Sequence, residues 1–249
     1  MKISVTHKNN SYQVDLSKPM DICIPFEAGE GHVIAWYQGP VKMEPVRMGD
    51  WVGSVKEGAG VNFNNIFFNP HAHGTHTETV GHISKDVESI NTHFNEYFCF
   101  ANLVSILPEK RGDDLVITLA QIKNACSEPS DAFIIRTLPN EGNKLSKNYS
   151  SSNPPYLEEA GATWLREQGV RHLMIDLPSV DREEDGGKLL AHHAFWNYPP
   201  ATRLDATITE LIFVEDKIKD GFYFMNLQVA PFVNDAAPSR PLLFELIKL

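Results

Sequence analysis

Four of the ten histidines of this 249-residue chain fall within one short segment that also contains a glutamate. The segment covers residues 69–82, and its imidazoles belong to His71, His73, His76 and His82. Neutral imidazole and carboxylate groups are the ligands that suit zinc, manganese or iron. A single histidine is more often structural or surface-exposed than a ligand, but this density of donors reverses that expectation. The segment therefore predicts a metal site.

The residues between these histidines favour a loop or an extended stretch over a helix. The segment opens with Pro70 and contains Gly74 and three threonines. Alternate side chains of an extended chain point to the same side, so His76 and Glu78 can reach one ion together. Gly74 allows the backbone to turn and bring either His71 or His73 alongside. This pattern differs from the helical H-E-x-x-H of zinc proteases, in which both histidines share a helix face.

A second set of candidate ligands lies more than a hundred residues later. His192 and His193 are adjacent, and the strand-like run Thr-Ile-Thr-Glu-Leu-Ile follows at residues 207–212. Alternation along that run places Glu210 on the side of two isoleucines, where a carboxylate is costly unless it is paired or metal-bound. The opposite register would leave Glu210 solvated, and the residues alone do not decide between the two.

These two segments resemble the cyclase family, which includes bacterial kynurenine formamidases and isatin hydrolases. Its members carry a pattern similar to H-x-G-T-H-x-D-x-P-x-H, and this chain has H-A-H-G-T-H-T-E-T-V-G-H at residues 71–82. Three positions depart from the pattern: Ala72 stands where the first family histidine would lie, Glu78 replaces an aspartate, and Val80 replaces a proline. The later His192 and Glu210 resemble the family's second contribution, so the likeness spans most of the chain.

The resemblance implies a role for each candidate. His76 and Glu78 would be metal ligands, with Glu78 bridging two ions. His71, which follows an Asn-Pro turn, is favoured over His73 as the first histidine ligand. His192, with His193 as the alternative, would bind the second ion together with Glu210. His82 would be the catalytic residue that moves protons.

The implied activity is that of a metal-dependent hydrolase acting on an amide-type C–N bond, as in an arylformamidase of tryptophan catabolism or an enzyme that opens a cyclic amide. Water activated by one or two divalent ions, Zn²⁺ first and Mn²⁺ second, would attack the carbonyl, and His82 would shuttle the proton. A lactone hydrolase, a metal-dependent cyclase or dehydratase, and a non-catalytic metal-binding module are the alternatives. The partner would be a small-molecule amide or a related acyl compound.

Composition restricts the setting of this chemistry. The net charge of −10 argues against nucleic-acid and anionic-membrane partners, since no basic excess exists to neutralise phosphates. The start of the chain lacks the apolar stretch of a secretory signal, and no apolar run reaches membrane-spanning length. The three cysteines are scattered and odd in number, which favours a reducing, cytoplasmic location.

Short apolar runs bounded by Gly, Pro, Asn and Asp dominate the chain and predict strands. The expected strands are Met20–Ile24, Val33–Tyr37, Val52–Val55, Leu103–Leu107, Phe133–Thr137, His172–Ile175, Thr207–Phe213 and Phe222–Ala230. The expected helices are Ile117–Ala125 and Glu158–Gln168, and two surface loops are expected at Glu141–Pro155 and Asp181–Asp185. This mixture indicates one α/β domain over residues 1–249. The resemblance implies a swivelling β/β/α-type fold with a central β-barrel-like sheet, usually in a homodimer.

Overall fold

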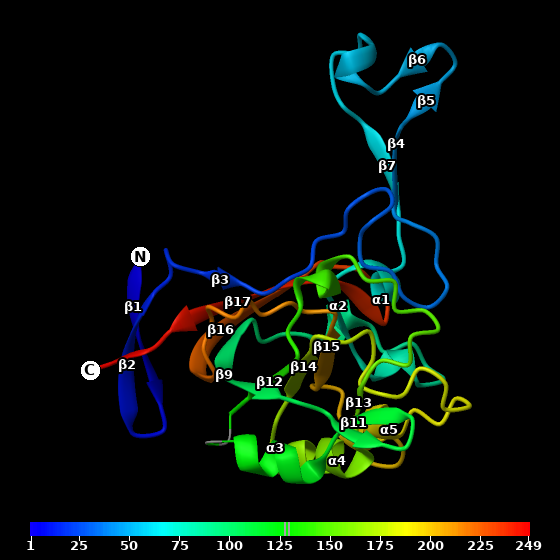
Figure 1. Cartoon of the computed structure of the whole chain (residues 1–249). Coiled ribbons are helices and arrows are strands. Elements are labelled where there is room, and N and C mark those ends of the chain that lie inside the picture. The colour runs from blue at the N-terminus through cyan, green and yellow to red at the C-terminus, as the bar shows by residue number, and fades with distance from the viewer. Residues whose placement is uncertain (127, 129) are drawn as a thin grey trace.

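A closed sheet of seven strands forms the centre of the computed structural model, which describes residues 1–126, 128 and 130–249 (Figure 1). The ring closes because its first and last strands pair with each other. In order around the ring the strands are β16 (Gly221–Val229), β9 (Phe98–Ile106), β12 (Ala132–Thr137), β14 (His172–Ile175), β15 (Thr207–Glu210), β8 (His76–Glu78) and β17 (Ala236–Glu245). The expected mixed α/β fold with a barrel-like sheet is therefore confirmed.

One half of the ring is parallel and the other half is antiparallel. Strands β9, β12, β14 and β15 run parallel to one another, as expected of strands joined by helical crossovers. The pairings β15–β8, β8–β17, β17–β16 and β16–β9 are antiparallel. The short β8 thus lies between β15 and β17, and this places residues 76–78 beside residues far away in the sequence.

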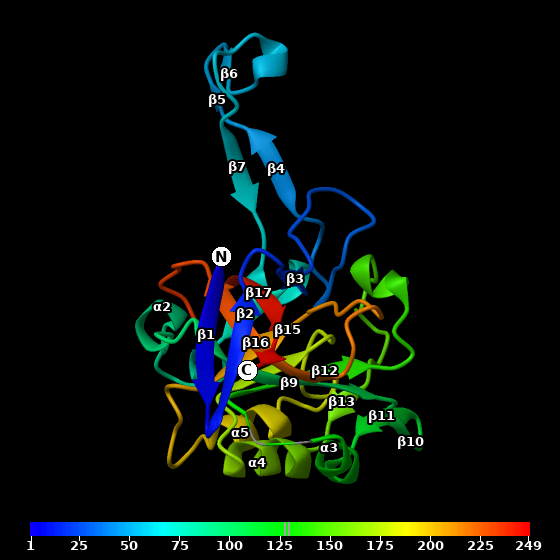
Figure 2. The same cartoon turned by 90° about the vertical axis from the view of Figure 1, so that its left-hand side faces the viewer.

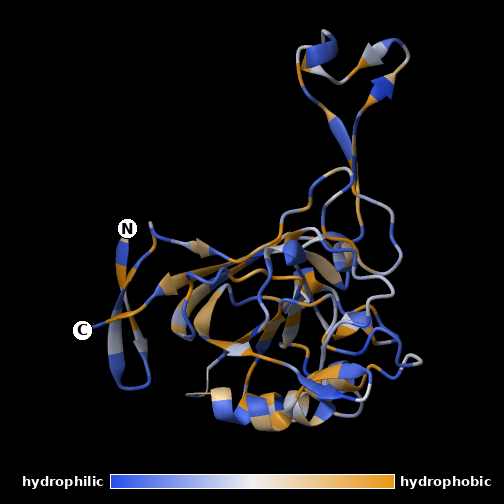
Figure 3. Cartoon of the chain, in the orientation of Figure 1, coloured by the Kyte–Doolittle hydropathy of each residue, from blue (hydrophilic) through white to orange (hydrophobic). Residues whose placement is uncertain are grey.

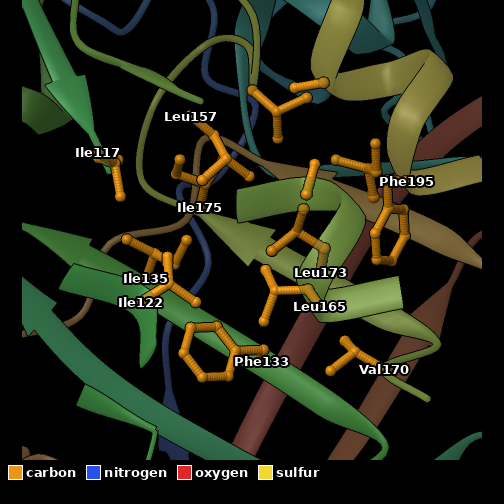
Figure 4. Close-up of a cluster of buried hydrophobic side chains, with 14 of the residues drawn as sticks. Ile117, Ile122, Phe133, Ile135, Leu157, Leu165, Val170, Leu173, Ile175 and Phe195 are labelled. Carbon is orange, nitrogen blue, oxygen red and sulfur yellow. The ribbon is translucent and has the colours of Figure 1, made fainter. Parts of the chain in front are cut away.

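Three helices cover the outer face of the parallel strands: α3 (Leu119–Ala125), α4 (Glu159–Glu167) and α5 (Leu190–Trp196) (Figure 1). Thr118 and Gln121 form a capping box that starts α3. Figure 4 shows the apolar layer between helices and sheet, in which Phe133 and Ile135 of β12 face Leu165 of α4. A second apolar cluster, which includes Met174 and Met225, fills the other side of the sheet. The sheet is consequently buried on both faces, and polar groups on its strands need partners.

Smaller elements surround the barrel. Near the termini, β1 (Lys2–His7), β2 (Asn10–Asp15) and β18 (Ile247–Lys248) form one small sheet, and β3 (Met20–Asp21) pairs with β17. A further sheet contains β10 (Glu109–Arg111), β11 (Asp114–Ile117) and β13 (Tyr156–Leu157). The short helical turns outside the arm are α1 (Pro70–His73), η2 (Val80–His82), α2 (Ile90–His93) and η3 (Gly142–Leu145).

Residues 42–67, called the arm below, project away from the barrel as a narrow ribbon (Figures 1 and 2). The arm's stem is the antiparallel pair β4 (Lys42–Pro45) and β7 (Asn64–Phe67). Its tip contains β5 (Arg47–Met48), β6 (Trp51–Val52) and the turn η1 (Val55–Glu57). Figure 3 shows polar and apolar residues alternating along this ribbon.

Most expected elements are present, with shifted ends. The helices expected at Ile117–Ala125 and Glu158–Gln168 are α3 and α4, and the strand expected at His172–Ile175 is β14. The runs expected at Leu103–Leu107, Phe133–Thr137, Thr207–Phe213 and Phe222–Ala230 correspond to β9, β12, β15 and β16. Of Met20–Ile24, only Met20–Asp21 is a strand. The loop expected at Glu141–Pro155 contains the single turn η3.

Two expected strands are wrong, and one long strand was missed. Val33–Tyr37 is a loop that is buried at residues 33–35, and its Trp36 and Tyr37 have positive φ angles. An apolar run alone does not distinguish a strand from such a loop. Within Val52–Val55, Gly53 ends the strand after Val52. Strand β17 was missed because Pro238 and Pro241 argue against a central strand, yet both residues lie in its ladder.

None of the helices in the described ranges is both long and apolar enough to cross a membrane.

The buried His172 on β14 should make stability depend on pH. Burial, and then the charge of Arg171, lower the pKa of His172 from 6.5 to about 4. Its Nδ1 lies 2.9 Å from the Thr207 hydroxyl. As pH falls below about 6.5, the unfolded chain takes up a proton at this position before the folded chain does, so folding becomes less favourable.

We expect this group to lower the free energy of unfolding by about 2 kcal/mol between pH 8 and pH 5. His172→Asn keeps a polar group near Thr207 and removes the titration. Urea unfolding at both pH values should show a pH-dependent loss about 2 kcal/mol smaller in the variant. Equal losses in both proteins would contradict this account of His172.

Candidate metal centre

The histidine-rich segment folds as one helical turn, an extended stretch and a second turn. Asn69 caps α1 by accepting a hydrogen bond from the backbone N–H of His71, and Pro70 occupies the first helical position. The expectation of a loop or extended stretch is therefore wrong for residues 70–73 and for η2, and right for β8. The capped turn is local in origin, since an Asn-Pro pair supplies both the cap and the fixed φ angle.

Two glycines allow this segment to pack closely against its neighbours. A Cβ atom on Gly81 would lie 2.5 Å from the backbone oxygen of Glu88, and one on Gly74 would lie 2.9 Å from that of Ile24. Gly74 is extended, with φ of 169°, so close approach rather than a left-handed backbone requires glycine here. The glycines therefore hold His76 and Glu78 deep in the fold.

Helix α5 and strand β15 bring the second set of residues to the same place. Glu210 is directly opposite His76 in the β15–β8 ladder. Asp181 starts α5 by accepting hydrogen bonds from the backbone N–H groups of Ala191 and His192, at 2.7 and 3.1 Å. The two segments that the sequence singled out thus meet at β8.

Glu78 lies at the centre of the site, with donors on both sides. Its Oε2 is 3.1 Å from Nδ1 of His71, and its Oε1 is 3.1 Å from Nε2 of His192. On the far side, Glu210 lies 3.5 Å from Nε2 of His76 and 3.8 Å from Nε2 of His192. The donor atoms of His71, His76 and Glu78 lie within 4.8 Å of one another, as do those of Glu78, His82 and His192. The five expected ligands and the expected catalytic His82 are therefore brought together.

The alternative histidines point elsewhere. His73 accepts a hydrogen bond from the backbone N–H of Asn69, and its Nε2 lies 2.7 Å from the Gly39 carbonyl. His193 contacts the carbonyl of Tyr198 through Nδ1, and its ring stacks on that tyrosine. Both rings are held by contacts outside the site. The geometry favours His71 and His192 at the two positions that the sequence left open.

Two aspartates of the site were not singled out from the sequence. Asp235, just before β17, places Oδ2 3.0 Å from Nε2 of His71 and 3.4 Å from Nδ1 of His82. Asp181 lies 2.6 Å from Nδ1 of His192. The expectation that Asp181–Asp185 is a solvated loop is wrong for Asp181, which is buried because α5 begins on its carboxylate. Of the two registers that the sequence left open for residues 207–212, the structure has the one that buries Glu210.

The electrostatics show a buried charge that the surrounding imidazoles compensate. Burial alone raises the pKa of Glu78, but His82, His192 and His71 together bring it well below its usual value. Burial alone would lower the pKa of His71 and of His192, yet their carboxylate partners raise both to about 10. Protonated imidazoles thus balance the carboxylates here, and a cation could supply the same positive charge.

Two buried atoms support a cation as the missing partner. Nε2 of His76 and Oε2 of Glu78 make no hydrogen bond of acceptable geometry within the described part of the chain, although both are shielded from solvent. Unpaired buried polar atoms are rare and costly, whereas imidazole nitrogen and carboxylate oxygen are the donors that zinc prefers. The residues present therefore fit a divalent metal ion.

The site opens onto a cavity of about 310 Å³. Imidazoles of His71, His82 and His192 line it, and the indole of Trp36 and the side chain of Leu189 supply apolar surface. The remaining lining residues are Asn69, Ser179 and Glu210. A cavity of this size, lined by both polar and apolar side chains, can hold a small ligand.

Comparisons with solved structures find the same fold in other proteins. A solved structure described as a potential metal-dependent hydrolase with cyclase activity is 20% identical, with a TM-score of 0.64 over 92% of this chain and 98% of that one. An isatin hydrolase bound to the product analogue thioisatinate is 13% identical, with a TM-score of 0.65 over 92% of each chain. Isatin hydrolase A from Labrenzia aggregata, bound to benzyl benzoate, is 16% identical, with a TM-score of 0.66 over 91% of this chain and 93% of that one.

These likenesses show a shared fold. Comparison with curated proteins gives no significant match. The family model for cyclases, by contrast, matches residues 14–182, which is more than half of the chain and includes the whole histidine-rich segment. The chain belongs to the cyclase family.

Proposed function

We propose that the protein is a metal-dependent hydrolase that cleaves an amide-type C–N bond in a small molecule. One observation carries the proposal: the fully buried carboxylate of Glu78 lies between two groups of imidazole and carboxylate donors. Several of these donors line a cavity together with His82. The structural likeness to isatin hydrolases, which open a cyclic amide, agrees with this reaction class.

The proposed ligands form two positions that share Glu78. His71 and His76 would complete one position, and His192 and Glu210 would complete the other. This donor set suits Zn²⁺, with Mn²⁺ as the alternative, in one or both positions. A divalent cation held there would supply the Lewis acidity that polarises a carbonyl and lowers the pKa of water from 15.7 to about 7.

His82 is the residue best placed to move protons. Its side chain is 31% exposed, whereas the side chains of His76 and His192 are at most 2% exposed. Asp235 lies beside its Nδ1 at 3.4 Å, which leaves Nε2 as the nitrogen that can take up and release a proton. His82 can therefore carry a proton from the nucleophile to the leaving nitrogen.

The apolar part of the cavity favours a substrate with a flat ring. Trp36 and Leu189 line the cavity together with the imidazoles. N-formylkynurenine, an intermediate of tryptophan catabolism, and isatin both combine an aromatic ring with an amide carbonyl. We propose an aromatic formamide or cyclic amide of this kind as the substrate class.

A second candidate is a metal-dependent cyclase or a lactone hydrolase. The relative described as a potential metal-dependent hydrolase with cyclase activity favours keeping this candidate. Steady-state assays of Zn²⁺- and Mn²⁺-loaded protein on isatin, aryl formamides and aryl lactones distinguish the two. Turnover restricted to lactones would replace the amide proposal, and no turnover on any of them would favour a non-catalytic metal-binding module.

Two further properties of the chain are proposals. We propose that residues 1–249 fold as one cooperative domain. We also propose a cytoplasmic location, because all three cysteines are unpaired, and burial raises the pKa of Cys23 to about 12, which keeps this thiol protonated.

Paired substitutions test the assignment of the ligands. We expect His71→Ala and His192→Ala each to remove about one equivalent of bound Zn²⁺, because each loses a ligand. His73→Ala and His193→Ala serve as matched controls and should retain the wild-type metal content. Metal analysis after dialysis gives the stoichiometry, and loss of metal in the control variants would contradict the assignment.

A separate substitution tests the role of His82. We expect His82→Ala to retain metal but to lower kcat by about 10²- to 10⁴-fold, since only the proton carrier is removed. The measurements are metal content and kcat on the best substrate of the panel. An empty metal site in this variant would show that His82 acts as a ligand instead.

We propose that the protein is a homodimer and that the arm contacts the second copy. A two-stranded ribbon is marginally stable alone, and this one exposes large apolar side chains, including Phe63, Ile66 and Phe67. The arm has three basic residues (Lys42, Arg47, Lys56) and three acidic ones (Glu44, Asp50, Glu57), so its net charge is zero while that of the chain is −10. Contact through the arm, whose net charge is zero, therefore keeps the negatively charged remainders of the two chains apart and avoids their repulsion.

Light scattering coupled to size exclusion tests the dimer. We expect a particle of about twice the 28.0 kDa chain mass, and Ile66→Asp with Phe67→Asp should shift it to the monomer mass. The control Asn64→Asp, on the same strand, adds a charge without removing apolar surface and should leave the dimer intact. A wild-type protein that runs as a monomer would contradict the proposal.

A further inference from the structure

Two histidines on opposite sides of Glu78 are each held from behind by an aspartate. His192 directs Nε2 to Oε1 of Glu78 at 3.1 Å, and its other nitrogen, Nδ1, lies 2.6 Å from Asp181. His71 directs Nδ1 to Oε2 of Glu78 at 3.1 Å, and its Nε2 lies 3.0 Å from Asp235. The two rings therefore present opposite nitrogens to the same glutamate.

Asp181 is fixed independently of its histidine. Its side chain is 5% exposed, and its two oxygens accept hydrogen bonds from the backbone N–H groups of Ala191 and His192. Its own N–H donates to the Ser179 hydroxyl at 3.0 Å. Since a carboxylate can only accept, Nδ1 of His192 carries a proton toward Asp181 whether or not metal is bound. When a cation displaces the second proton of the ring, the nitrogen that becomes free to bind it is therefore Nε2, which points to Glu78.

Asp235 plays the same part for His71. The backbone of Asp235 is anchored to the histidine-rich segment, because its carbonyl accepts a hydrogen bond from the N–H of Thr79 at 3.0 Å. Its carboxylate accepts from Nε2 of His71, so Nδ1 of His71 is the nitrogen that gives up its proton when a cation binds. Asp235 lies on the far side of the imidazole from Glu78. It is therefore badly placed to share an ion with Nδ1 of His71.

An oxygen of Glu78 that lacks a hydrogen-bond partner among the described residues supports a cation between Glu78 and His71. Oε2 of Glu78 lies 3.1 Å from Nδ1 of His71 and yet makes no hydrogen bond of acceptable geometry with any residue that the structure describes. Two lone pairs that face each other are repulsive unless a proton or a cation lies between them. An oxygen of Glu78 also lies within 4.8 Å of a ring nitrogen of His76, and Nε2 of His76 is a second buried atom without a hydrogen-bond partner among the described residues.

We propose that Asp181 and Asp235 are positioning residues that each fix one histidine ligand, so that His192 binds metal through Nε2 and His71 binds metal through Nδ1. The inference rests on the proposed metal-dependent function. Each aspartate governs one of the two positions that share Glu78. Asp235 also contacts His82 at 3.4 Å, so it links the His71 position to the proton carrier.

Nitrogen-15 NMR of the Zn²⁺-loaded protein, labelled at histidine, tests the proposal without any substitution. Long-range ¹H–¹⁵N correlations distinguish a protonated ring nitrogen from one that binds metal. We expect His192 to be protonated at Nδ1 and metal-bound at Nε2, and His71 to be the reverse. Metal binding through the same nitrogen in both rings would overturn the proposal.

Isosteric variants test which position each aspartate controls. We expect Asp181→Asn to weaken one equivalent of Co²⁺ by about 10- to 100-fold and Asp235→Asn to weaken the other, as measured by absorption titration. In a His192→Ala background, Asp181→Asn should cause no further loss, because its only route to the metal is gone. A further loss there, or unchanged affinities in both single variants, would overturn the proposal.

The outcomes separate this proposal from the proposed function. A wild-type protein that takes up neither Co²⁺ nor Zn²⁺ would contradict both the metal-dependent function and the positioning role of the aspartates. If the wild-type protein binds metal and both aspartate variants bind it with the same affinities, the positioning role is contradicted. The hydrolase proposal is not affected by that result. Asp21→Asn, at an aspartate that pairs with Arg240 and contacts none of these histidines, is the control and should bind Co²⁺ as the wild type does.

Discussion

The buried carboxylate of Glu78 is the constraint on which the site depends. A carboxylate with no exposure to solvent destabilises the fold unless opposite charge surrounds it. Here the compensation comes from imidazoles supplied by three separate elements: α1, η2 and α5. Without a metal His71 and His192 hold protons, as their raised pKa values indicate, and with a metal the cation replaces part of that charge.

The strand pairings of the barrel fix the positions of the site residues. Strand β8 is only three residues long, but it pairs on both sides, with β15 and with β17. The first pairing sets Glu210 beside His76, and the second brings the residue just before β17, Asp235, next to His71 and His82. Helix α5 begins on Asp181 and thereby aims His192 at the same point. Precision at the site therefore comes from sheet register and one helix start, both of which are rigid.

The sequence was most informative where chemistry depends on local spacing. His76 and Glu78 were expected to act together because alternate residues of a strand share a side, and β8 confirms that they do lie on one strand. Glu210 was expected on an apolar side of its strand, and it is buried. The barrel itself was expected from the family resemblance, whereas the strands of its parallel half were visible as short apolar runs.

Features that depend on distant contacts were not visible in the sequence. The choice between His71 and His73 rests on a single helical turn capped by Asn69, which places one ring toward Glu78 and the other toward Gly39. Asp235 carries no motif, since only the pairing of β17 with β8 brings it to the site. The prolines of β17 masked that strand, and Asp181 was hidden in a run of charges that is otherwise exposed.

The most direct test of the account is anomalous scattering from crystals grown with Zn²⁺, collected on both sides of the zinc edge. The account predicts zinc within bonding distance of Glu78, either between His71 and His76 or between His192 and Glu210, or at both positions. Zinc bound only to surface groups, with the Glu78 carboxylate free of metal, would contradict it.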